Sequence, residues 1–576
     1  MSSASAAFVR LPVWRARMLL AGLLAAFLLV LGRAAYLQGM KTEFLQGKGE
    51  ARYSRVIEVP ATRGRIADRH GDALAISTPV RSIWAIPEAV PDDPAQLKKL
   101  SALLDMDAGE LGRKVGDTSR DFVYLKRQLA PETAQRVAAL GLPGLYQHRE
   151  FRRYYPGGEV TAHVVGFTGV EDAGQEGIEL AFQSRLAGKP GSRRVIRDRL
   201  GRIVEDIESI RQAQDGAHLT LAIDSKIQNL AYGALKSAVL AHRARAGGIV
   251  VLDVRSGEVL ALANQPSYNP NNRARLSGAQ LRNRVLTDTF EPGSTLKPFT
   301  VALALELGRV SPRTTIQTGQ GKLTIANYTI HDAHPHEDGV MSVSQVIQKS
   351  SNVGVAKIAL SLARNDMWEF YRQLGFGASP ALGFPGEAAG RLRDAKTWRP
   401  IEQATMAYGH GISVSLMQLA RAYSIFARDG DMVSLSLVRR DAEAPAARVV
   451  SPQTARAVRD MLELAVQPGG TGPRARTMGY RVAGKTGTAH KQEHGGYAQH
   501  KYISSFAGFA PVSAPRLVIA VMLDEPSAGQ YYGGAVAAPV FSQVMQGALR
   551  LLGVAPDAPM VPVPLPGEGE EAREST

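Results

Sequence analysis

One apolar segment near the N-terminus constrains this chain more than any other sequence feature. Residues Met18 to Leu31 are uninterrupted apolar or small, and the segment continues past Arg33 to Gln38, about the length of a helix that crosses a bilayer. Three arginines precede it: Arg10, Arg15 and Arg17. Positive charge favours the cytoplasmic side, which predicts a cytoplasmic tail at 1–17, a membrane helix at 18–38 and an exported remainder. The alternative is a cleaved signal peptide.

Net charge and cysteine content further restrict the compartment and the partners that suit this chain. The chain has no cysteine, which excludes disulfides and cysteine-ligated metals and suits an oxidising compartment. The net charge of +15 indicates an anionic neighbourhood such as nucleic acid, anionic lipid or an acidic polymer. The sequence has no long basic run with interleaved aromatic residues, so nucleic acid is the weakest of these candidates.

Residues 39–216 are polar, basic and mixed in pattern, which predicts an extended, loop-rich pedestal without catalytic function. Arginines and acids gather around glycines at 63–71, 152–156 and 174–179. We interpret these clusters as ion pairs and tight turns, because none of them places a base beside a nucleophile. Helices are expected at Asp93–Asp105 and Pro131–Leu140.

Residues 217–554 predict an α+β domain. A strand at His218–Ile223 precedes a helix capped by Asp224-Ser225, and two apolar runs around Arg255-Ser256-Gly257 indicate a hairpin. Further strands are expected at 479–483, 503–510 and 516–523. Helices are expected between them, at 343–349, 351–363, 416–427 and 451–466. Strands at both ends with helices between imply an antiparallel sheet with a helical insertion. The Pro- and Glu-rich tail 555–576 is expected to be disordered.

Within this domain, Glu291-Pro292-Gly293-Ser294-Thr295-Leu296-Lys297-Pro298 predicts a buried helix that begins near Ser294, with Pro298 in its first turn. Ser294 and Lys297 then lie at i and i+3 on one face, close enough to hydrogen-bond. A serine beside a desolvated lysine is one arrangement that activates a hydroxyl as a nucleophile. Alone, however, a Ser-x-x-Lys match is weak evidence.

Two later motifs strengthen the case that this Ser-x-x-Lys match is catalytic. Ser350-Ser351-Asn352 lies between two expected helices, and Lys485-Thr486-Gly487 lies on an expected strand. Ser-x-x-Lys, Ser-x-Asn and Lys-Thr-Gly together form the serine set of penicillin-binding proteins and class A β-lactamases. Their order and their element types make coincidence a poor explanation.

Beyond these three motifs, four further segments are informative: Arg63-Gly64, Arg152–Pro156, Tyr408–Gly411 and Tyr531–Gly534. With them, the chain resembles the class B penicillin-binding proteins, and among them the division-specific type. The resemblance runs from the membrane segment to near Leu551. It implies a membrane-anchored peptidoglycan D,D-transpeptidase of septal cell-wall synthesis, with a serine transpeptidase/β-lactamase-like domain at 217–554. It also implies that 39–216 docks partners, among them a membrane glycosyltransferase and other division proteins, and that the catalytic domain is periplasmic, held at the inner membrane by a single pass.

The expected chemistry follows from the residue types. Ser294 would attack the D-Ala-D-Ala carbonyl of a stem peptide, and β-lactams would acylate the same serine. Lys297, its pKa lowered by burial beside other cations, would take the hydroxyl proton, and Ser350 would relay it. The amide of Asn352 suits the substrate's peptide or the lysine, and Lys485 would keep the pocket positive. Substrate contacts are expected from Thr486, Gly487, Thr488, Tyr497, Tyr502, Tyr531 and Tyr532, although the tyrosines could also serve only in packing.

Two other functions fit the same sequence. A β-lactamase or β-lactam sensor would share the fold, but the middle residue of the second motif is Ser351 rather than Asp, and no deacylating glutamate is evident. A catalytically silent division scaffold is the other alternative.

No cofactor or metal is expected. The segment His331–Asp338 is rich in possible zinc ligands, including His331, His334 and His336. Pro335 breaks helical spacing there, and alternating histidines on a polar loop are usually solvated.

Overall fold

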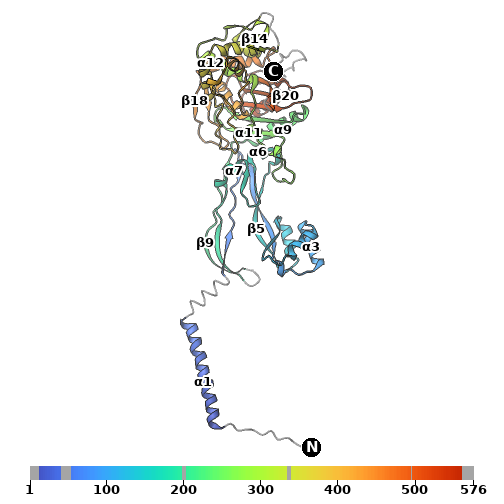
Figure 1. Ribbon diagram of the computed structural model, residues 1–576, viewed down its shortest axis with the longest axis vertical. Coiled ribbons are helices and arrows are strands. Elements are labelled where there is room, and N and C mark those ends of the chain that lie inside the picture. The colour runs from blue at the N-terminus through green and yellow to red at the C-terminus, as the bar shows by residue number, and fades with distance from the viewer. Residues whose placement is uncertain (1–11, 41–53, 198–202, 334–338, 494–495, 561–576) are drawn as a thin grey trace. The chain divides into compact units, whose positions relative to one another are not determined.

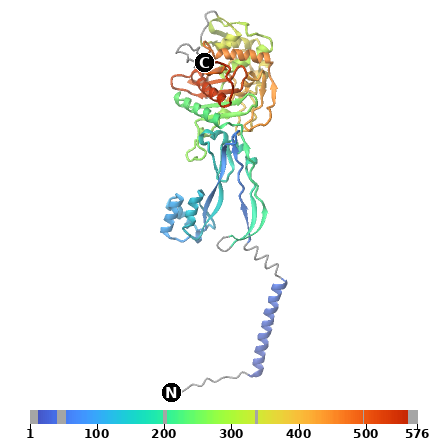
Figure 2. The same cartoon turned by 180° about the vertical axis from the view of Figure 1, so that it is seen from behind.

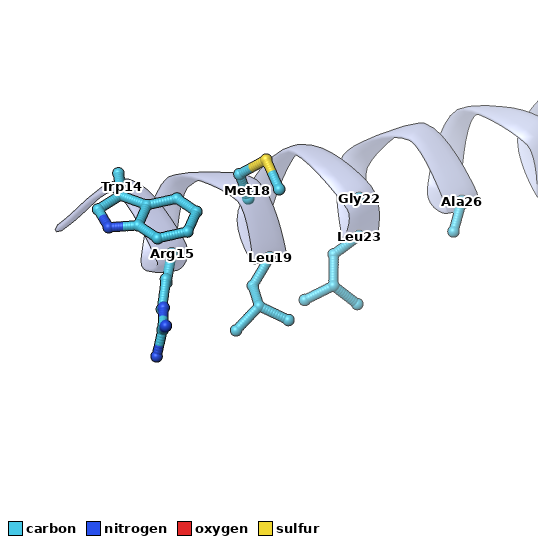
Figure 3. A pocket seen from close by; sticks show the side chains of 7 residues that line it. All are labelled: Trp14, Arg15, Met18, Leu19, Gly22, Leu23 and Ala26. Atoms are coloured by element: carbon cyan, nitrogen blue, oxygen red, sulfur yellow. The ribbon is translucent and has the colours of Figure 1, made fainter. Parts of the chain in front are cut away.

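The computed structural model describes residues 12–40, 54–197, 203–333, 339–493 and 496–560. Its first element is helix α1 (Val13–Ala35), which continues as a π-helical turn, Tyr36–Met40. Within the described residues, Val13–Gly39 is the one helix long and apolar enough to cross a membrane. It begins ahead of the predicted Met18. Figure 3 shows Leu19 and Leu23 pointing to the same side of this helix as Arg15, which lies 5.2 Å from the ring of Trp14.

The described chain divides into two compact units. The first comprises residues up to 61, Arg81–Glu150 and Gly188–Asp215; the second comprises Thr62–Val80, Phe151–Ala187 and everything from Gly216 onwards. The units therefore do not follow a single cut in the sequence. Both expected pedestal segments near 62–80 and 151–187 join the unit that holds the three motifs.

The first unit combines a small sheet with helices. Three of its helices are short: α3 (Pro94–Leu104), α4 (Ala108–Gly116) and α5 (Pro131–Ala138). The Asp93 carboxylate caps α3 by accepting from the amides of Ala95 and Gln96, so the helix expected at 93–105 is confirmed. A separate antiparallel ribbon has the order β1-β8-β9. Its strands are β1 (Ser54–Val59), β8 (Gly191–Arg197) and β9 (Ile203–Arg211), of which β9 is labelled in Figure 1.

Buried ion pairs hold the early segments of the second unit. The Glu179 carboxylate accepts from Nε of Arg63 and from Nε of Arg153, both at 2.6 Å, and all three side chains are buried. Arg63 also donates to the Glu179 carbonyl, and Arg153 to the Gly64 carbonyl. The ion pairs expected from the arginine–glycine clusters are therefore confirmed.

The second unit is built on a five-stranded sheet of order β12-β11-β21-β20-β19, antiparallel throughout. In that order its strands are Val259–Gln265, Ala246–Asp253, Leu517–Asp524, Gly496–Ala510 and Ala483–Glu493. The hairpin expected around Arg255-Ser256-Gly257 is β11–β12. Of the strand expected at 479–483, only Ala483 lies in β19, because Thr477 bridges to Tyr480 across a turn in which Gly479 has a φ of +84°.

Alternation along β11 divides the core between the two faces of this sheet. Ile249 and Val251 pack with α9 (Ser225–Ala241) and α20 (Ala538–Leu551), which Figure 2 shows in green and red. Val250 and Leu252 face the helical insertion. This insertion lies between β12 and β19 and includes α12 (Lys297–Glu306), α13 (Val343–Gln348), α14 (Asn352–Leu360), α17 (Leu416–Ala427) and α18 (Pro452–Ala465). The predicted α+β class is confirmed.

The C-terminal tail departs from its prediction at its beginning. Residues 555–560 are described, and the Asp557 carboxylate accepts from the backbone amides of Arg481 and Ser513. The amides of Asp557 and Ala558 in turn donate to the Gly479 carbonyl. The expectation of disorder from residue 555 onwards is therefore wrong for these six residues, because backbone hydrogen bonds tether them. Residues 561–576 lie outside the described residues.

Candidate active site

The Ser-x-x-Lys motif lies where a turn enters a buried helix. Gly293–Leu296 form a 3₁₀ turn that leads directly into α12, with Pro298 in the first helical turn as expected. Ser294 is 2% exposed and Lys297 is fully buried. Gly293 has a φ of +56°, which favours glycine, and a Cβ there would lie 3.2 Å from the Thr488 carbonyl oxygen. The turn is thus seated against β19.

Lys297 reaches the second motif. Its Nζ donates to the Ser350 carbonyl at 2.5 Å and to the Ser350 hydroxyl at 3.0 Å. Ser350 has a φ of +62°, a left-handed conformation that disfavours a non-glycine residue by roughly 1–2 kcal/mol. This strained conformation presents both oxygens of Ser350 to one ammonium group, and such strain tends to cluster at functional sites.

Asn352 begins α14 beside this contact. Its Nδ2 donates to the His331 carbonyl at 3.1 Å, whereas its Oδ1 is buried and has no hydrogen-bond partner among the residues that the structure describes. A buried acceptor without a donor is unfavourable unless a ligand supplies one. The amide therefore presents a vacant acceptor at the site.

Asp332 binds the start of α14. Its carboxylate accepts from the Ser351 hydroxyl at 2.7 Å and from the Val353 amide at 2.9 Å. In the sequence, Asp332 belongs to a segment rich in possible zinc ligands. Among the described residues no group of side chains is arranged to hold a metal, and His334–Asp338 lie outside them. The structure assigns Asp332 instead to the N-terminus of α14.

The Lys-Thr-Gly motif lies on β19, fully buried. Lys485 Nζ lies 3.2 Å from both Thr471 Oγ1 and Thr486 Oγ1, and these two hydroxyls are 2.8 Å apart. A Cβ on Gly487 would come within 2.8 Å of the Pro292 carbonyl oxygen. Glycine therefore allows β19 to pass close to the turn Gly293–Leu296, called the nucleophile turn below because it contains Ser294. Thr488 Oγ1 accepts from the Gly533 amide at 3.0 Å. Thr471 was missed because it belongs to none of the motifs.

The four tyrosines fall into two groups. Tyr531 stacks on Tyr502 and on Tyr532, with ring centroids 4.0 and 4.4 Å apart. Burial raises the pKa of Tyr502. Tyr497 lies apart from this stack, with its hydroxyl 3.0 Å from a Glu291 carboxylate oxygen, and burial raises its pKa to about 12. His490 lies between the groups, 4.7 Å from Tyr502 and 6.4 Å from Tyr497.

A half-buried histidine adds to the electrostatics of the site. His410 lies 5.0 Å from Tyr408 and 5.9 Å from Tyr497. Burial, and next the positive charge of Lys297, lower the pKa of His410 to about 4. The imidazole is therefore neutral at neutral pH and adds no second cation beside Lys297. The sequence offered one signal for it, the segment Tyr408–Gly411.

The structure thus brings together a buried serine, a buried lysine, a second serine, an amide and a second buried lysine. A serine hydroxyl served by a lysine can attack a carbonyl. Backbone amides at the start of the helix and on β19 can stabilise the oxyanion that forms. The arrangement suits acyl transfer.

Comparison with known proteins agrees with this chemistry. Residues 58–221 match the family described as penicillin-binding protein dimerisation domain, and residues 247–546 match the penicillin binding protein transpeptidase domain. The chain is 43% identical to a probable peptidoglycan D,D-transpeptidase PenA of Neisseria gonorrhoeae, covering 93% of this chain and 92% of the relative. It is 41% identical to the peptidoglycan D,D-transpeptidase FtsI of Escherichia coli, covering 95% and 93%.

Solved structures give the same picture. The apo transpeptidase domain of penicillin-binding protein 3 from Burkholderia pseudomallei is 50% identical, with a TM-score of 0.55, and the match covers 59% of this chain and 98% of that one. A peptidoglycan synthetase from Bifidobacterium adolescentis is 25% identical, with a TM-score of 0.69, covering 88% and 99%. With both domain types matched, and relatives this similar along nearly the whole length, the chain belongs to the class B penicillin-binding proteins, which are peptidoglycan transpeptidases.

Proposed function

We propose that this protein crosslinks the stem peptides of septal peptidoglycan through an acyl-enzyme on Ser294. The observation that carries the proposal is the buried contact between Lys297 and both oxygens of Ser350, with Ser294 in the turn that leads into the Lys297 helix. Burial disfavours the charged form of a lysine. We therefore assign Lys297 as the general base that takes the Ser294 proton.

The reaction passes through an ester on Ser294 and ends in a new peptide bond. Ser294 Oγ attacks the penultimate D-Ala carbonyl, and its proton passes to Lys297. The peptide bond to the last D-Ala breaks, and this D-Ala leaves as an amine that takes a proton by way of Ser350. The amine of a second stem peptide then attacks the ester, forms the crosslink and returns the proton to Ser294. Amides at the start of the Ser294 helix and at Thr488 stabilise each oxyanion.

The remaining residues hold the donor peptide. Asn352 Oδ1 can accept from a substrate amide, because it has no donor in the described residues. Lys485 keeps the pocket positive, and Thr486, Gly487 and Thr488 line it along β19, the edge strand of the sheet, where the threonine hydroxyls suit the terminal carboxylate. We assign Tyr497, Tyr502, Tyr531 and Tyr532 to the walls of the peptide groove.

The test uses the full chain in detergent with a stem pentapeptide that ends in D-Ala-D-Ala and an acceptor peptide. We expect release of D-Ala and a crosslinked dimer, both lost in Ser294→Ala. Ser361→Ala, which changes a serine at the end of α14, should retain both. Unchanged D-Ala release by Ser294→Ala would contradict the proposal.

A β-lactam distinguishes this function from that of a β-lactamase of the same fold. A transpeptidase should hold a chromogenic β-lactam as a long-lived ester, because attack by water is slow. We expect one equivalent of colour change and no steady turnover. Rapid turnover would instead identify a β-lactamase.

The organisation of the chain at the membrane is part of the same proposal. We assign 1–17 to a cytoplasmic tail, 18–38 to a single span of the bacterial inner membrane, 39–216 to a non-catalytic pedestal and 217–554 to a periplasmic transpeptidase domain. The apolar helix Val13–Gly39 supports the anchor. Because no catalytic motif lies before residue 217, glycan polymerisation would come from a membrane glycosyltransferase among the division proteins. A fluorescent fusion at midcell would support a division role, and signal along the side wall would contradict it.

A further inference from the structure

Glu291, three residues before Ser294, has no role in the chemistry described above, and its surroundings are unusual for a carboxylate. Its side chain is 6% exposed. Oε1 accepts from the Gly411 amide at 2.8 Å and from Gln492 Nε2 at 2.7 Å. Oε2 accepts from the Tyr497 hydroxyl at 3.0 Å. Donors from three separate segments thus meet at one carboxylate.

Two of these donors belong to one position of the β19–β20 hairpin. Gln492 on β19 and Tyr497 on β20 are cross-strand partners, so the carboxylate binds both strands at the same level. β19 also carries Lys485, Thr486 and Thr488. A contact that fixes the far end of this hairpin therefore also fixes the path of the strand that lines the site.

The third donor comes from a loop that already touches the nucleophile turn. A Cβ on Gly409 would come within 2.4 Å of the Gly293 backbone nitrogen. Phe290, next to Glu291, exchanges two backbone hydrogen bonds with Val414 at 3.0 Å each. Glu291 therefore lies at the point where the loop at 408–411, the hairpin and the nucleophile turn converge.

The charge of these contacts argues against a merely stabilising role. All three donors are neutral, and within the described ranges no lysine or arginine forms an ion pair with Glu291. Burial raises the pKa of Glu291, although the Gly411 amide and the Tyr497 hydroxyl act in the opposite direction. A buried carboxylate bound only by neutral donors is a poor way to gain stability, because its desolvation is unfavourable. Groups of this kind tend to be kept at functional sites.

We propose that Glu291 is a positioning residue, which ties the β19–β20 hairpin and the Gly411 loop to the nucleophile turn and so holds β19 at the distance from Ser294 that acylation requires. This inference rests on the proposed function of Ser294. Glu291 itself need not touch the reacting atoms. Its effect should appear in the rate of the acylation step, because misplacement of about 1 Å can reduce a rate about 100-fold.

The experiment measures acylation of the full chain in detergent by a chromogenic β-lactam, with rapid mixing to separate the acylation rate constant from the dissociation constant of the first complex. We expect Glu291→Ala to lower the rate constant roughly 10- to 100-fold. Glu291→Gln keeps an acceptor oxygen for Gly411 and Gln492, and its amide can donate to the Tyr497 hydroxyl. It should stay within about 3-fold of the parent, which a requirement for the negative charge would not allow.

Glu306→Ala provides the matched control. Glu306 lies at the end of α12, the helix that follows the turn at Gly293–Leu296, and its carboxylate accepts from the amide and hydroxyl of Ser451. Its loss should lower thermal stability without changing the acylation rate constant. An acylation rate constant for Glu291→Ala equal to that of Glu306→Ala would overturn the proposal and leave Glu291 a structural residue.

Two further variants keep the test decisive if Glu291→Ala does not fold. Gln492→Ala and Tyr497→Phe each remove one donor, and each should lower the rate constant by a smaller factor. The double variant Gln492→Ala/Tyr497→Phe leaves the carboxylate with the Gly411 amide alone, and its rate constant should fall further than in either single variant. A parent-like rate constant in the double variant would overturn the proposal. Ser294→Ala separates the two proposals: if that variant is still acylated, the proposed function fails, whereas normal acylation of Glu291→Ala alone overturns only the role of Glu291.

Discussion

Two clusters of buried charge lie in the same compact unit, and they are built in opposite ways. In the first, one carboxylate, Glu179, is bound by the guanidinium groups of Arg63 and Arg153 at 2.6 Å. In the second, Lys297 donates to the neutral oxygens of Ser350, and Lys485 Nζ lies near the hydroxyls of Thr471 and Thr486. Both clusters are removed from water.

The difference separates a structural cluster from a chemical one. A buried ion pair with matched geometry holds its charges, because each charge offsets the desolvation of the other. In the second cluster the lysines contact hydroxyl and carbonyl oxygens, and a serine hydroxyl beside a buried lysine is an arrangement that can activate a nucleophile. Buried charge alone therefore does not identify an active site; the chemistry of the partners does.

The largest expected effect comes from Lys297→Ala. Removal of a general base typically lowers a rate 10²- to 10⁴-fold, and we expect acylation by a chromogenic β-lactam to fall within this range. The control is Lys357→Ala, since Lys357 donates from the exposed side of α14 to the Gln317 carbonyl. Near-normal acylation of Lys297→Ala would contradict the role of Lys297 as the general base.

Glu179→Gln should break the structural cluster instead. Removing one partner of a buried ion pair leaves uncompensated charge and lowers stability by about 3–5 kcal/mol. Denaturation of the full chain in detergent measures this loss, while the folded fraction should acylate at the normal rate. The matched control is Glu159→Gln, whose ion pair with Lys236 is about half exposed and should be worth less than about 1 kcal/mol. Equal losses for the two variants would contradict the account.

The pH dependence of stability tests a buried imidazole, that of His163. His163 is buried, with Nε2 2.7 Å from the Gln280 carbonyl, and burial lowers its pKa to about 4 from an ordinary 6.5. At pH values between these two pKa values, His163 binds a proton in the unfolded chain but not in the folded chain, so the free energy of unfolding falls as pH falls. At pH 5 the loss should be on the order of 2 kcal/mol.

The variant His163→Gln isolates that contribution. It should be less stable than the parent at pH 7.5, but its stability should decline less between pH 7.5 and pH 5. His410, whose pKa is lowered in the same direction, remains in both proteins and cancels in the comparison. An unchanged pH dependence would show that His163 does not titrate in this way.

The smallest expected effect concerns Asp332. Asp332→Ala removes the acceptor for the Ser351 hydroxyl and the Val353 amide, and loss of such a helix-terminal contact lowers stability by about 1 kcal/mol. Acylation should slow as well, because Ser350 and Asn352 flank Ser351. Asp332→Asn, which keeps an acceptor oxygen, should recover part of both effects. Equal behaviour of the two variants would argue against a positioning contact.

Local patterns explain what the sequence could predict. α17 has the predicted bounds Leu416–Ala427, and Asp224 caps α9 as expected through its bonds to Lys226 and Ile227, because these signals are contained in a few adjacent residues. The three motifs are also local, and the fold brings them together. Thr471, Asp332 and Glu291 were not assigned, because each acts through contacts with residues distant in the chain.

The division into compact units was unpredictable for the same reason. Thr62–Val80 joins the unit that carries the motifs through tertiary contacts: β2 (Ile66–Ala67) pairs in parallel with β10 (Leu219–Thr220), and Arg63 binds Glu179. No composition change marks such a pairing. A boundary at residue 216 separates the non-catalytic segment from the motifs, whereas the contacts of the fold group Thr62–Val80 with the motifs.

The most direct test of the account is mass spectrometry of the full chain after incubation with benzylpenicillin. We expect one adduct with the mass of the intact antibiotic, carried by the peptide that contains Ser294 and absent from Ser294→Ala. The adduct should persist long after free antibiotic is removed. An adduct on any other residue, or none on the folded protein, would contradict the claim that Ser294 is the nucleophile.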